Sequence, residues 1–195
     1  MLENSASDVT LTDRVPIPPI DLELLAFFNR PGQPWLDAVM RAASSRIFSL
    51  PVLAVIAAFI GVRSPQRWLG VAVLLAAVGL TDLAAARVLK PEFGRTRPCA
   101  TRPQAYSTTL DDCGSGESMP SIHAADSAAA AVVAFWALPL FGPVAALISL
   151  LIGVSRVYLG QHWPTDVVAG WLTGAAIASA LVWVTRLRYA VVRKR

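Results

Sequence analysis

Five long apolar runs, separated by polar breaks, occupy most of the chain after residue 46. A helix rises about 1.5 Å per residue, so runs of this length approach or match the roughly 30 Å hydrocarbon core of a bilayer. The pattern therefore predicts an all-α integral membrane protein, built as a bundle of five transmembrane helices. The predicted spans are Ile47–Val62, Trp68–Leu89, Ala124–Phe141, Pro143–Gly160 and Val167–Val184.

The first 45 residues follow a different pattern. Residues 1–20 are polar and end in the proline-rich segment PIPPI, which disfavours helix, so we predict a mobile arm. No secretory signal is visible there, so membrane insertion is expected to come from the internal runs. Between residues 21 and 45, apolar positions recur at helical spacing while Asp37 and Arg41 fall elsewhere. We predict an amphipathic segment lying on the membrane interface, with a sixth span as the alternative.

Composition supports the membrane assignment. Of the 195 residues, 55% are hydrophobic and 15% are charged, and the mean hydropathy is +0.54. Soluble domains carry about 25% charged residues. The net charge of +4 gathers largely beside the last apolar run, which is typical of a membrane-surface anchor and not of nucleic-acid binding. We therefore expect one membrane-embedded domain over residues 21–190, followed by a basic tail at 191–195.

The distribution of basic residues predicts an orientation. Arg63 and Arg67, in a short loop, fall on the same side as the basic C-terminus, which is expected to be cytoplasmic. Alternation of spans then places Lys90–Ile122 and Gln161–Thr165 together on the opposite, periplasmic face of a bacterial inner membrane. Cys99 and Cys113 both lie in the longer of these loops, where an oxidising compartment favours a disulfide; two free thiols are the alternative.

A histidine and an aspartate stand where one apolar run ends and the next begins. If Pro164 opens the following helix, His162 lies at its mouth and Asp166 in its first turn. The carboxylate can then hold one imidazole nitrogen and leave the other free to attack. Arg156 adds a fixed positive charge nearby. This combination suits nucleophilic attack on a phosphate.

Topology brings a second polar group to the same face. Helix starts bind anions, so the backbone at Ser121–His123 is a predicted phosphate cradle, and His123 is a candidate general acid. Lys90 and Arg97 would add two cations to that of Arg156. By contrast, Arg95 and Arg102 are interpreted as ordinary solvated loop charges.

These residues resemble the three motifs of the type 2 phosphatidic acid phosphatase superfamily, K-x6-R-P, P-S-G-H and S-R-x5-H-x3-D. Here they are Lys90…Arg97-Pro98, Pro120-Ser121-Ile122-His123 and Ser155-Arg156…His162…Asp166. The resemblance implies that His162 becomes phosphorylated, that Asp166 orients it and that His123 protonates the leaving group. It further implies that Lys90, Arg97, Ser121, Ile122 and Arg156 bind the phosphate, with no metal and no cofactor. Ile122 departs from the family glycine; its N–H can still donate, but its branched side chain narrows the approach.

The resemblance implies a membrane lipid phosphatase, with a lipid phosphate in the bilayer as substrate and a monomer or homodimer as the working unit. Undecaprenyl pyrophosphate is the preferred substrate, ahead of phosphatidylglycerol phosphate, phosphatidate and lipid A 1-phosphate. A phosphotransferase using the same phosphohistidine, or a non-catalytic lipid-binding protein, are the alternatives from other classes. Asp82 and Asp126, inside predicted spans, are interpreted as structural, and the G-x3-G pattern at Gly170 and Gly174 as a site of close packing or a dimer seam.

Overall fold

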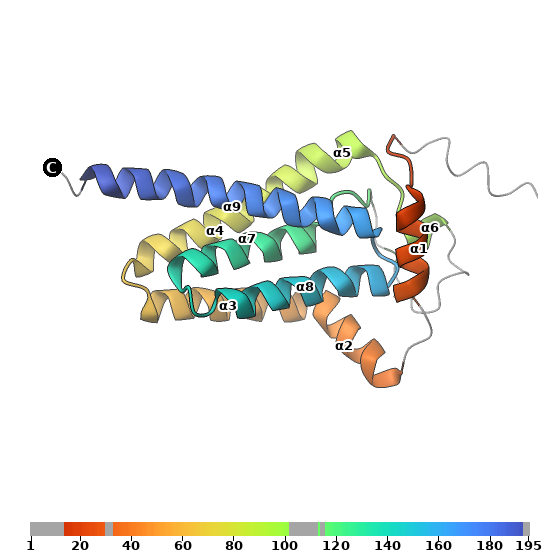
Figure 1. The fold of residues 1–195 in the computed structure, drawn as a ribbon, viewed down its shortest axis with the longest axis horizontal. Coiled ribbons are helices and arrows are strands. Elements are labelled where there is room, and N and C mark those ends of the chain that lie inside the picture. Colours follow the sequence, from red (N-terminus) through yellow and green to blue (C-terminus); the bar gives the residue numbers. More distant parts are fainter. Residues whose placement is uncertain (1–13, 30–32, 102–112, 114–115, 193–195) are drawn as a thin grey trace, which may run out of the picture.

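The computed structural model describes residues 14–29, 33–101, 113 and 116–192, and every regular element within those ranges is a helix. Five helices run side by side along the long axis of the molecule (Figure 1). They are α3 (Arg46–Arg63), α4 (Arg67–Ala84), α7 (Ile122–Ala137), α8 (Gly142–Tyr158) and α9 (Pro164–Val192). Among the described residues, three helical stretches are long and apolar enough to cross a membrane, and α7 and α8 are shorter apolar helices. The predicted all-α membrane bundle is confirmed.

The ends of the helices follow local sequence rules. α4 continues through a π-helical turn, η1 (Ala85–Leu89), into α5 (Lys90–Phe93), which ends where Gly94 adopts a left-handed conformation with φ of 52°. α7 ends at Ala137, four residues before the predicted end of that span. The cause is Pro139, which disfavours helix at the residue before it.

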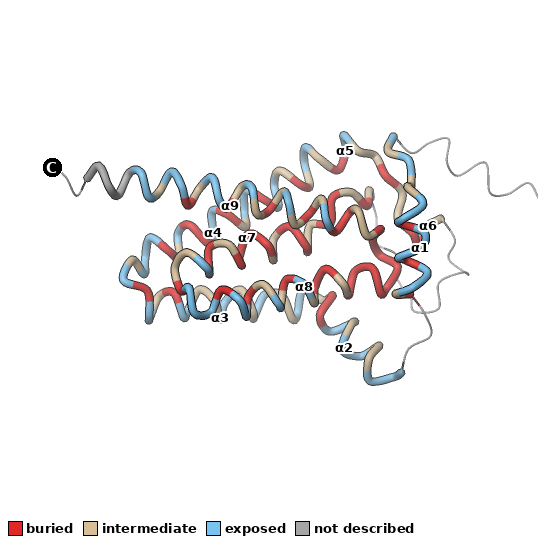
Figure 2. The backbone as a smooth tube through the Cα atoms, in the orientation of Figure 1, coloured by how far each residue is buried: buried red, intermediate tan, exposed pale blue. Residues whose placement is uncertain are grey.

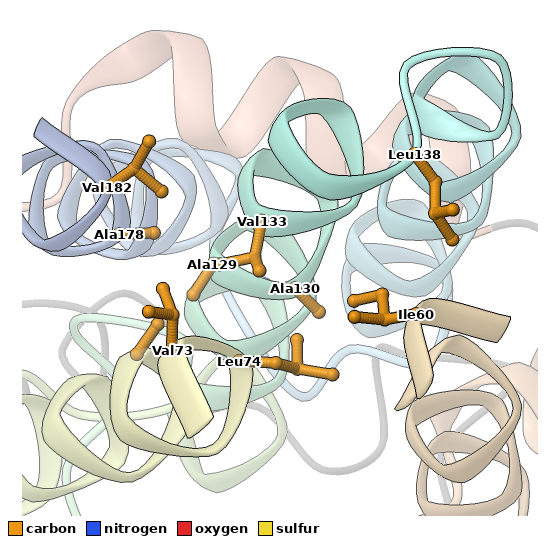
Figure 3. Close-up of a cluster of buried hydrophobic side chains, with 10 residues drawn as sticks. Ile60, Val73, Leu74, Ala129, Ala130, Val133, Leu138, Ala178 and Val182 are labelled. Atoms are coloured by element: carbon orange, nitrogen blue, oxygen red, sulfur yellow. The ribbon is translucent and has the colours of Figure 1, made fainter. Parts of the chain in front are cut away.

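The core of the bundle is built around α7. Its alanines let neighbouring helices approach closely, and its Ala129, Ala130 and Val133 pack with side chains from α3, α4 and α9 (Figure 3). Gly170 and Gly174 bring α9 even nearer: a Cβ at Gly174 would overlap the carbonyl oxygen of Ala125, and one at Gly170 that of Ser121. The G-x3-G pattern thus serves packing within the bundle, and it fixes the start of α7 against the start of α9.

The outer surface of the bundle is apolar. Figure 2 shows that burial is concentrated where helices face one another and at one end of the bundle. Large apolar side chains project outward from α3, α4 and α9, including Ile47, Trp68 and Leu172, which are 87%, 74% and 67% exposed. A surface of this kind is suited to lipid.

The N-terminal region differs from the prediction in two respects. Residues 1–13 of the predicted arm lie outside the described residues, but α1 (Pro19–Phe28) already begins inside it, because Pro19 suits the first position of a helix. The predicted interfacial segment is in fact two helices, α1 and α2 (Pro34–Ser44). α1 lies across one end of the bundle (Figure 1), where Leu25 packs against Trp163 and Val167. It therefore belongs to the folded domain and is not merely a surface segment.

Candidate active site

The three predicted motifs meet at the end of the bundle that α1 covers, and the C-terminus lies at the other end (Figure 1). The first motif begins with α5 at Lys90 and ends at Pro98, the first residue of α6 (Pro98–Thr101). The second motif begins α7, and the third runs from the end of α8 into the first turn of α9. The structure thus brings together residues that are up to 76 positions apart in the sequence, from Lys90 to Asp166.

Gly160 sets the path of the chain into the third motif. It has a φ of 64°, and its N–H donates to the carbonyl of Val157, while the N–H of Gln161 donates to the carbonyl of Arg156. This pair of bonds closes helix α8 with the left-handed turn that glycine adopts without steric cost. The turn delivers His162 to the start of α9, which opens at Pro164 as predicted.

The ring of His162 lies between the carboxylate of Asp166 and the guanidinium of Arg97. Its Nδ1 is 3.5 Å from Oδ2 of Asp166, and its Nε2 is 3.3 Å from Nη1 of Arg97. A guanidinium can only donate, so Nε2 is the acceptor and Nδ1 carries the proton in this arrangement. The spacing on the Asp166 side is longer than a good hydrogen bond. The lone pair on Nε2 therefore points toward Arg97.

Asp166 is held by its own helix and by Arg95, which we had interpreted from the sequence as a solvated loop charge. Its Oδ2 accepts a bond of 2.9 Å from the N–H of Trp163, the return half of a capping box. Its Oδ1 accepts from Nη1 of Arg95 at 2.7 Å, and both side chains are completely buried. The interpretation of Arg95 as a solvated loop charge is therefore wrong, because two carboxylates neutralise the guanidinium inside the fold. Arg102 lies outside the described residues.

The second carboxylate comes from α1. Asp21 binds Nη2 of Arg95 at 2.5 Å and accepts two bonds from Thr165, from its N–H at 2.8 Å and from its hydroxyl at 2.6 Å. Thr165 is in the first turn of α9, where backbone N–H groups lack partners within the helix. Trp163, at the capping position, has no side-chain oxygen, so Asp21 caps α9 from another helix. Nothing in the local sequence around Asp21 signalled this role.

The second motif presents an unpaired donor to the site. The hydroxyl of Ser121 is buried and has no hydrogen-bond partner, although Ser121 precedes α7 and is placed to cap it. The backbone N–H of Ser121 donates to the carbonyl of Asp166 at 3.0 Å, which removes this one N–H from the predicted phosphate cradle. The N–H groups of Ile122 and His123 remain in the unpaired first turn of α7. Ile122 adopts ordinary helical backbone, so its position does not require the family glycine.

Three cations surround His162. Arg97 contacts the ring directly, Lys90 is buried and donates to the carbonyl of Glu117, and Arg156 is buried and donates to the carbonyl and hydroxyl of Ser44 at the end of α2. Burial of the imidazole, together with the charges of Arg156, Arg97 and Lys90, holds the pKa of His162 well below its ordinary value. The ring is therefore neutral at physiological pH, as a nucleophile must be.

The remaining predicted features also find places in the structure. His123 lies in the first turn of α7 at the mouth of a cavity. Cys99 and Cys113 form a disulfide in the loop that follows the first motif. Within the described part of the chain, no three His, Cys, Asp or Glu side chains gather closely enough to hold a metal ion.

Comparison with known proteins agrees with this arrangement. A sequence profile of the PAP2 superfamily matches residues 67–190, well over half of the chain. The chain belongs to the PAP2 superfamily. It is therefore a membrane lipid phosphatase that hydrolyses phosphate esters, built on the transmembrane form of that fold.

Relatives with different substrates match most of its length. Phosphatidylglycerophosphatase B of Bacillus subtilis (strain 168) is 32% identical over 73% of this chain and 71% of its own. Lipid A 4'-phosphatase of Bacteroides thetaiotaomicron is 30% identical over 80% of this chain and 72% of its own. Undecaprenyl-diphosphatase of Sulfolobus acidocaldarius is 42% identical, but over only 31% of this chain and 30% of its own.

Solved structures show the same fold. The transmembrane PAP2 type phosphatidylglycerolphosphate phosphatase from Bacillus subtilis superposes with a TM-score of 0.64 at 26% identity, covering 86% of this chain and 85% of that one. Aquifex aeolicus LpxE superposes with a TM-score of 0.67 at 26% identity, covering 84% of this chain and 94% of that one.

Proposed function

We propose that the protein removes a phosphate from a membrane lipid by way of a phosphohistidine at His162. The observation that carries this proposal is the position of the His162 ring, with Asp166 at Nδ1 and the lone pair of Nε2 turned toward Arg97. Nε2 attacks phosphorus, forming the N–P bond as the bond to the leaving oxygen breaks. His123, which takes up a proton when the anionic phosphate binds beside it, gives that proton to the oxygen. Asp166 stabilises the positive charge that develops on the ring.

Hydrolysis of the intermediate completes the cycle. A water attacks phosphorus, the N–P bond breaks, and the proton of the water returns to His123. Lys90, Arg97 and Arg156 stabilise the charge on the three non-bridging oxygens during both steps, with the Ser121 hydroxyl and the Ile122 N–H as further donors. Each of these residues is buried or partly buried, so their charges act at low dielectric.

A phosphate monoester of a lipid is the proposed substrate. The two relatives that align over most of this chain are named for phosphatidylglycerophosphate and lipid A, whereas the undecaprenyl-diphosphatase aligns over less than a third of it. Undecaprenyl pyrophosphate, the preferred substrate from sequence alone, thus becomes the second candidate.

Phosphate release in detergent tests the proposal. The purified protein is given phosphatidylglycerol phosphate, phosphatidate or undecaprenyl pyrophosphate in the presence of chelator, and wild type is compared with His162→Ala. We expect release by wild type, its loss in the variant, and radiolabel on wild-type protein when the reaction is quenched during turnover of a substrate that carries labelled phosphate. Label on the protein without phosphate release would instead indicate a phosphotransferase. Release that survives in His162→Ala would refute the phosphohistidine.

We further propose that the site faces the periplasm of a bacterial inner membrane. The supporting observations are the basic loop Arg63–Arg67 and the basic C-terminal region at the opposite end of the bundle, and the disulfide on the side of the site. Intact cells treated with a membrane-impermeant reductant and an impermeant thiol reagent should become labelled at Cys99 and Cys113. Labelling that requires lysis would reverse the orientation.

A further inference from the structure

A cavity of about 290 Å³ extends from the site into the bundle between α3, α4, α7 and α8. On α7 it follows Ile122, His123, Asp126 and Ala130, about two turns and so roughly 10 Å of depth. Pockets that hold small-molecule ligands span about 300–1,000 Å³. At the lower end of this range, the cavity suits the head group of a lipid, and it is too small for any long hydrocarbon chain.

The cavity lies where the leaving group of the proposed reaction must go. In phosphoryl transfer the attacking and leaving atoms stand roughly in line on opposite sides of phosphorus. With His162 on one side and His123 protonating the leaving oxygen on the other, the leaving alcohol points past His123. His123 and Ile122 form the wall of the cavity at that end.

The lining is unusual for a space inside a membrane bundle. Most of it is apolar, but two carboxyl groups, Asp82 of α4 and Asp126 of α7, face it together with the guanidinium of Arg46. Ser127 and Ser149, which are hydrogen-bonded to each other at 2.8 Å, add hydroxyls to the wall. Intramembrane carboxyl groups are costly and mark functional sites by default. Among the described residues, neither Asp82 nor Asp126 forms an ion pair that would explain this placement.

Asp126 places an unpaired hydrogen-bond acceptor in the wall of the cavity. Its Oδ1 is buried and has no hydrogen-bond partner. Asp82 and Arg46 act on its charge, but neither forms an ion pair with it within the described residues. A buried acceptor without a donor is unfavourable, and a hydrocarbon chain entering the cavity would leave it so. A hydroxyl group on the ligand would satisfy it.

We propose that this cavity is a head-group site that selects lipid phosphates whose leaving alcohol carries a free hydroxyl close to the scissile phosphate, as glycerol and sugar head groups do. Asp126 accepts the hydrogen bond, Asp82 supplies a second acceptor, and the apolar wall contacts the carbon skeleton. The inference rests on the proposed function, since it assigns the alcohol side of the same reaction. It disfavours isoprenoid diphosphates, whose leaving group is an isoprenyl monophosphate that would bring a second phosphate anion, and no alcohol hydroxyl, toward Asp126 and Asp82.

A matched pair of substrates isolates the hydroxyl. One is 1-O-hexadecyl glycerol 3-phosphate, and the other is 3-hexadecyloxypropyl phosphate, which differs by the loss of that single hydroxyl. Phosphate release in detergent gives kcat/KM for each, and farnesyl diphosphate serves as the isoprenoid probe. We expect wild type to favour the hydroxylated lipid over its deoxy analogue by about tenfold to a hundredfold, the range for one buried hydrogen bond. In Asp126→Leu this ratio should fall to near one.

The ratio separates specificity from folding, because a folding defect lowers both rates together. Thr81→Val is the matched control, since Thr81 is a buried polar residue of α4 outside the cavity, and it should keep the wild-type ratio. Equal ratios in wild type and Asp126→Leu, or a wild-type preference for farnesyl diphosphate, would overturn the head-group site while leaving the phosphatase intact. Absence of release from all three probes by wild type would instead count against the proposed function.

Discussion

Arg95 and Asp166 form an ion pair of 2.7 Å in which both side chains are completely buried. The same guanidinium binds Asp21 through its other terminal nitrogen, Nη2, and its central carbon lies 5.6 Å from the ring centre of Trp163. One arginine thus connects the N-terminal helix α1 to the carboxylate that orients His162. It does not need to touch a substrate to affect turnover, because it fixes the position of a residue that contacts the nucleophile.

Replacing Arg95 should therefore lower both stability and turnover. Arg95→Ala leaves two buried carboxylates without their cation, and breaking such a pair costs about 3–5 kcal/mol. Arg95→Lys keeps the charge but has a single ammonium in place of a fork, so it cannot bind Asp21 and Asp166 in the same geometry. We expect Arg95→Lys to melt between Arg95→Ala and wild type, with kcat lowered and KM little changed. Thermal unfolding and turnover in detergent measure these effects.

The control for Arg95 is Arg63→Ala, which removes an exposed arginine at the far end of the bundle. It should leave both the melting temperature and kcat near wild type. If Arg95→Lys were indistinguishable from wild type in kcat, the orienting role of Arg95 would be lost and the pair would be only a structural contact.

Asp21 should matter more than any other acidic residue of α1. Asp21→Ala removes the cap of Thr165 and half of the Arg95 contacts, and loss of a helix cap costs about 0.5–2 kcal/mol. We expect a lower melting temperature and faster proteolytic cleavage within α1. Glu23→Ala, at an exposed position of the same helix, should change neither. Equal protease resistance in the two variants would show that α1 is held by its apolar contacts alone.

The sequence was sufficient to predict the bundle and most of the site because both depend on local patterns. Apolar runs located all five bundle helices, and the motif spacings located Lys90, Arg97, Ser121 and His162 before any contact was known. Arg95 was misassigned because a loop arginine two residues from a motif arginine has no distinguishing local pattern. Its burial comes from Asp21, 74 residues away, and a contact at that separation depends on how α1 docks.

The cavity was equally invisible in the sequence. Asp82 and Asp126 stood out as polar residues inside apolar runs, but their rotation about separate helices decides whether they face each other, a third helix or lipid. Only the packing of α3, α4, α7 and α8 places both on the wall of one cavity. Sequence periodicity predicts which residues share one face of a helix, but only the tertiary structure shows which helix, cavity or lipid surface that face contacts.

His162 should remain neutral at pH values where an ordinary histidine is protonated. Its pKa is lowered by burial and by the positive charges of Arg156, Arg97 and Lys90. Within the described residues, Asp166 is the only carboxylate within ion-pair distance of the ring to oppose them. The chain has two histidines, so labelled imidazoles give two NMR signals, and His123→Gln assigns them. We expect the His162 signal to show no titration between pH 8 and about 6, around the usual value of about 6.5.

The same shift has a consequence for stability. Because the folded-state pKa of His162 lies below the unfolded value, the unfolded chain takes up this proton first as the pH falls. The group therefore lowers the free energy of unfolding as the pH drops through about 6.5, and has no such effect above it. In His162→Gln the decline of melting temperature between pH 7 and 5 should be shallower than in wild type. A His162 signal that titrates at or above 6.5 would contradict both expectations.

Gly174 provides the most direct test of how α9 positions the second motif. An added methyl group would collide with the backbone carbonyl of Ala125, which cannot move without shifting the start of α7. Overpacking of this kind costs about 1–3 kcal/mol. We expect Gly174→Ala to lower the melting temperature and also kcat, because Ser121 and His123 lie within one turn of the displaced carbonyl.

Gly79→Ala is the matched control, since it makes the same substitution inside α4 where nothing lies within 4 Å of the added Cβ. Helix propensity alone favours alanine over glycine by about 1 kcal/mol, so this variant should melt at or above the wild-type temperature. The two substitutions thus have opposite expected signs, and propensity cannot account for both. If Gly174→Ala also raised the melting temperature with full activity, α9 would not pack on α7 as closely as the structure requires.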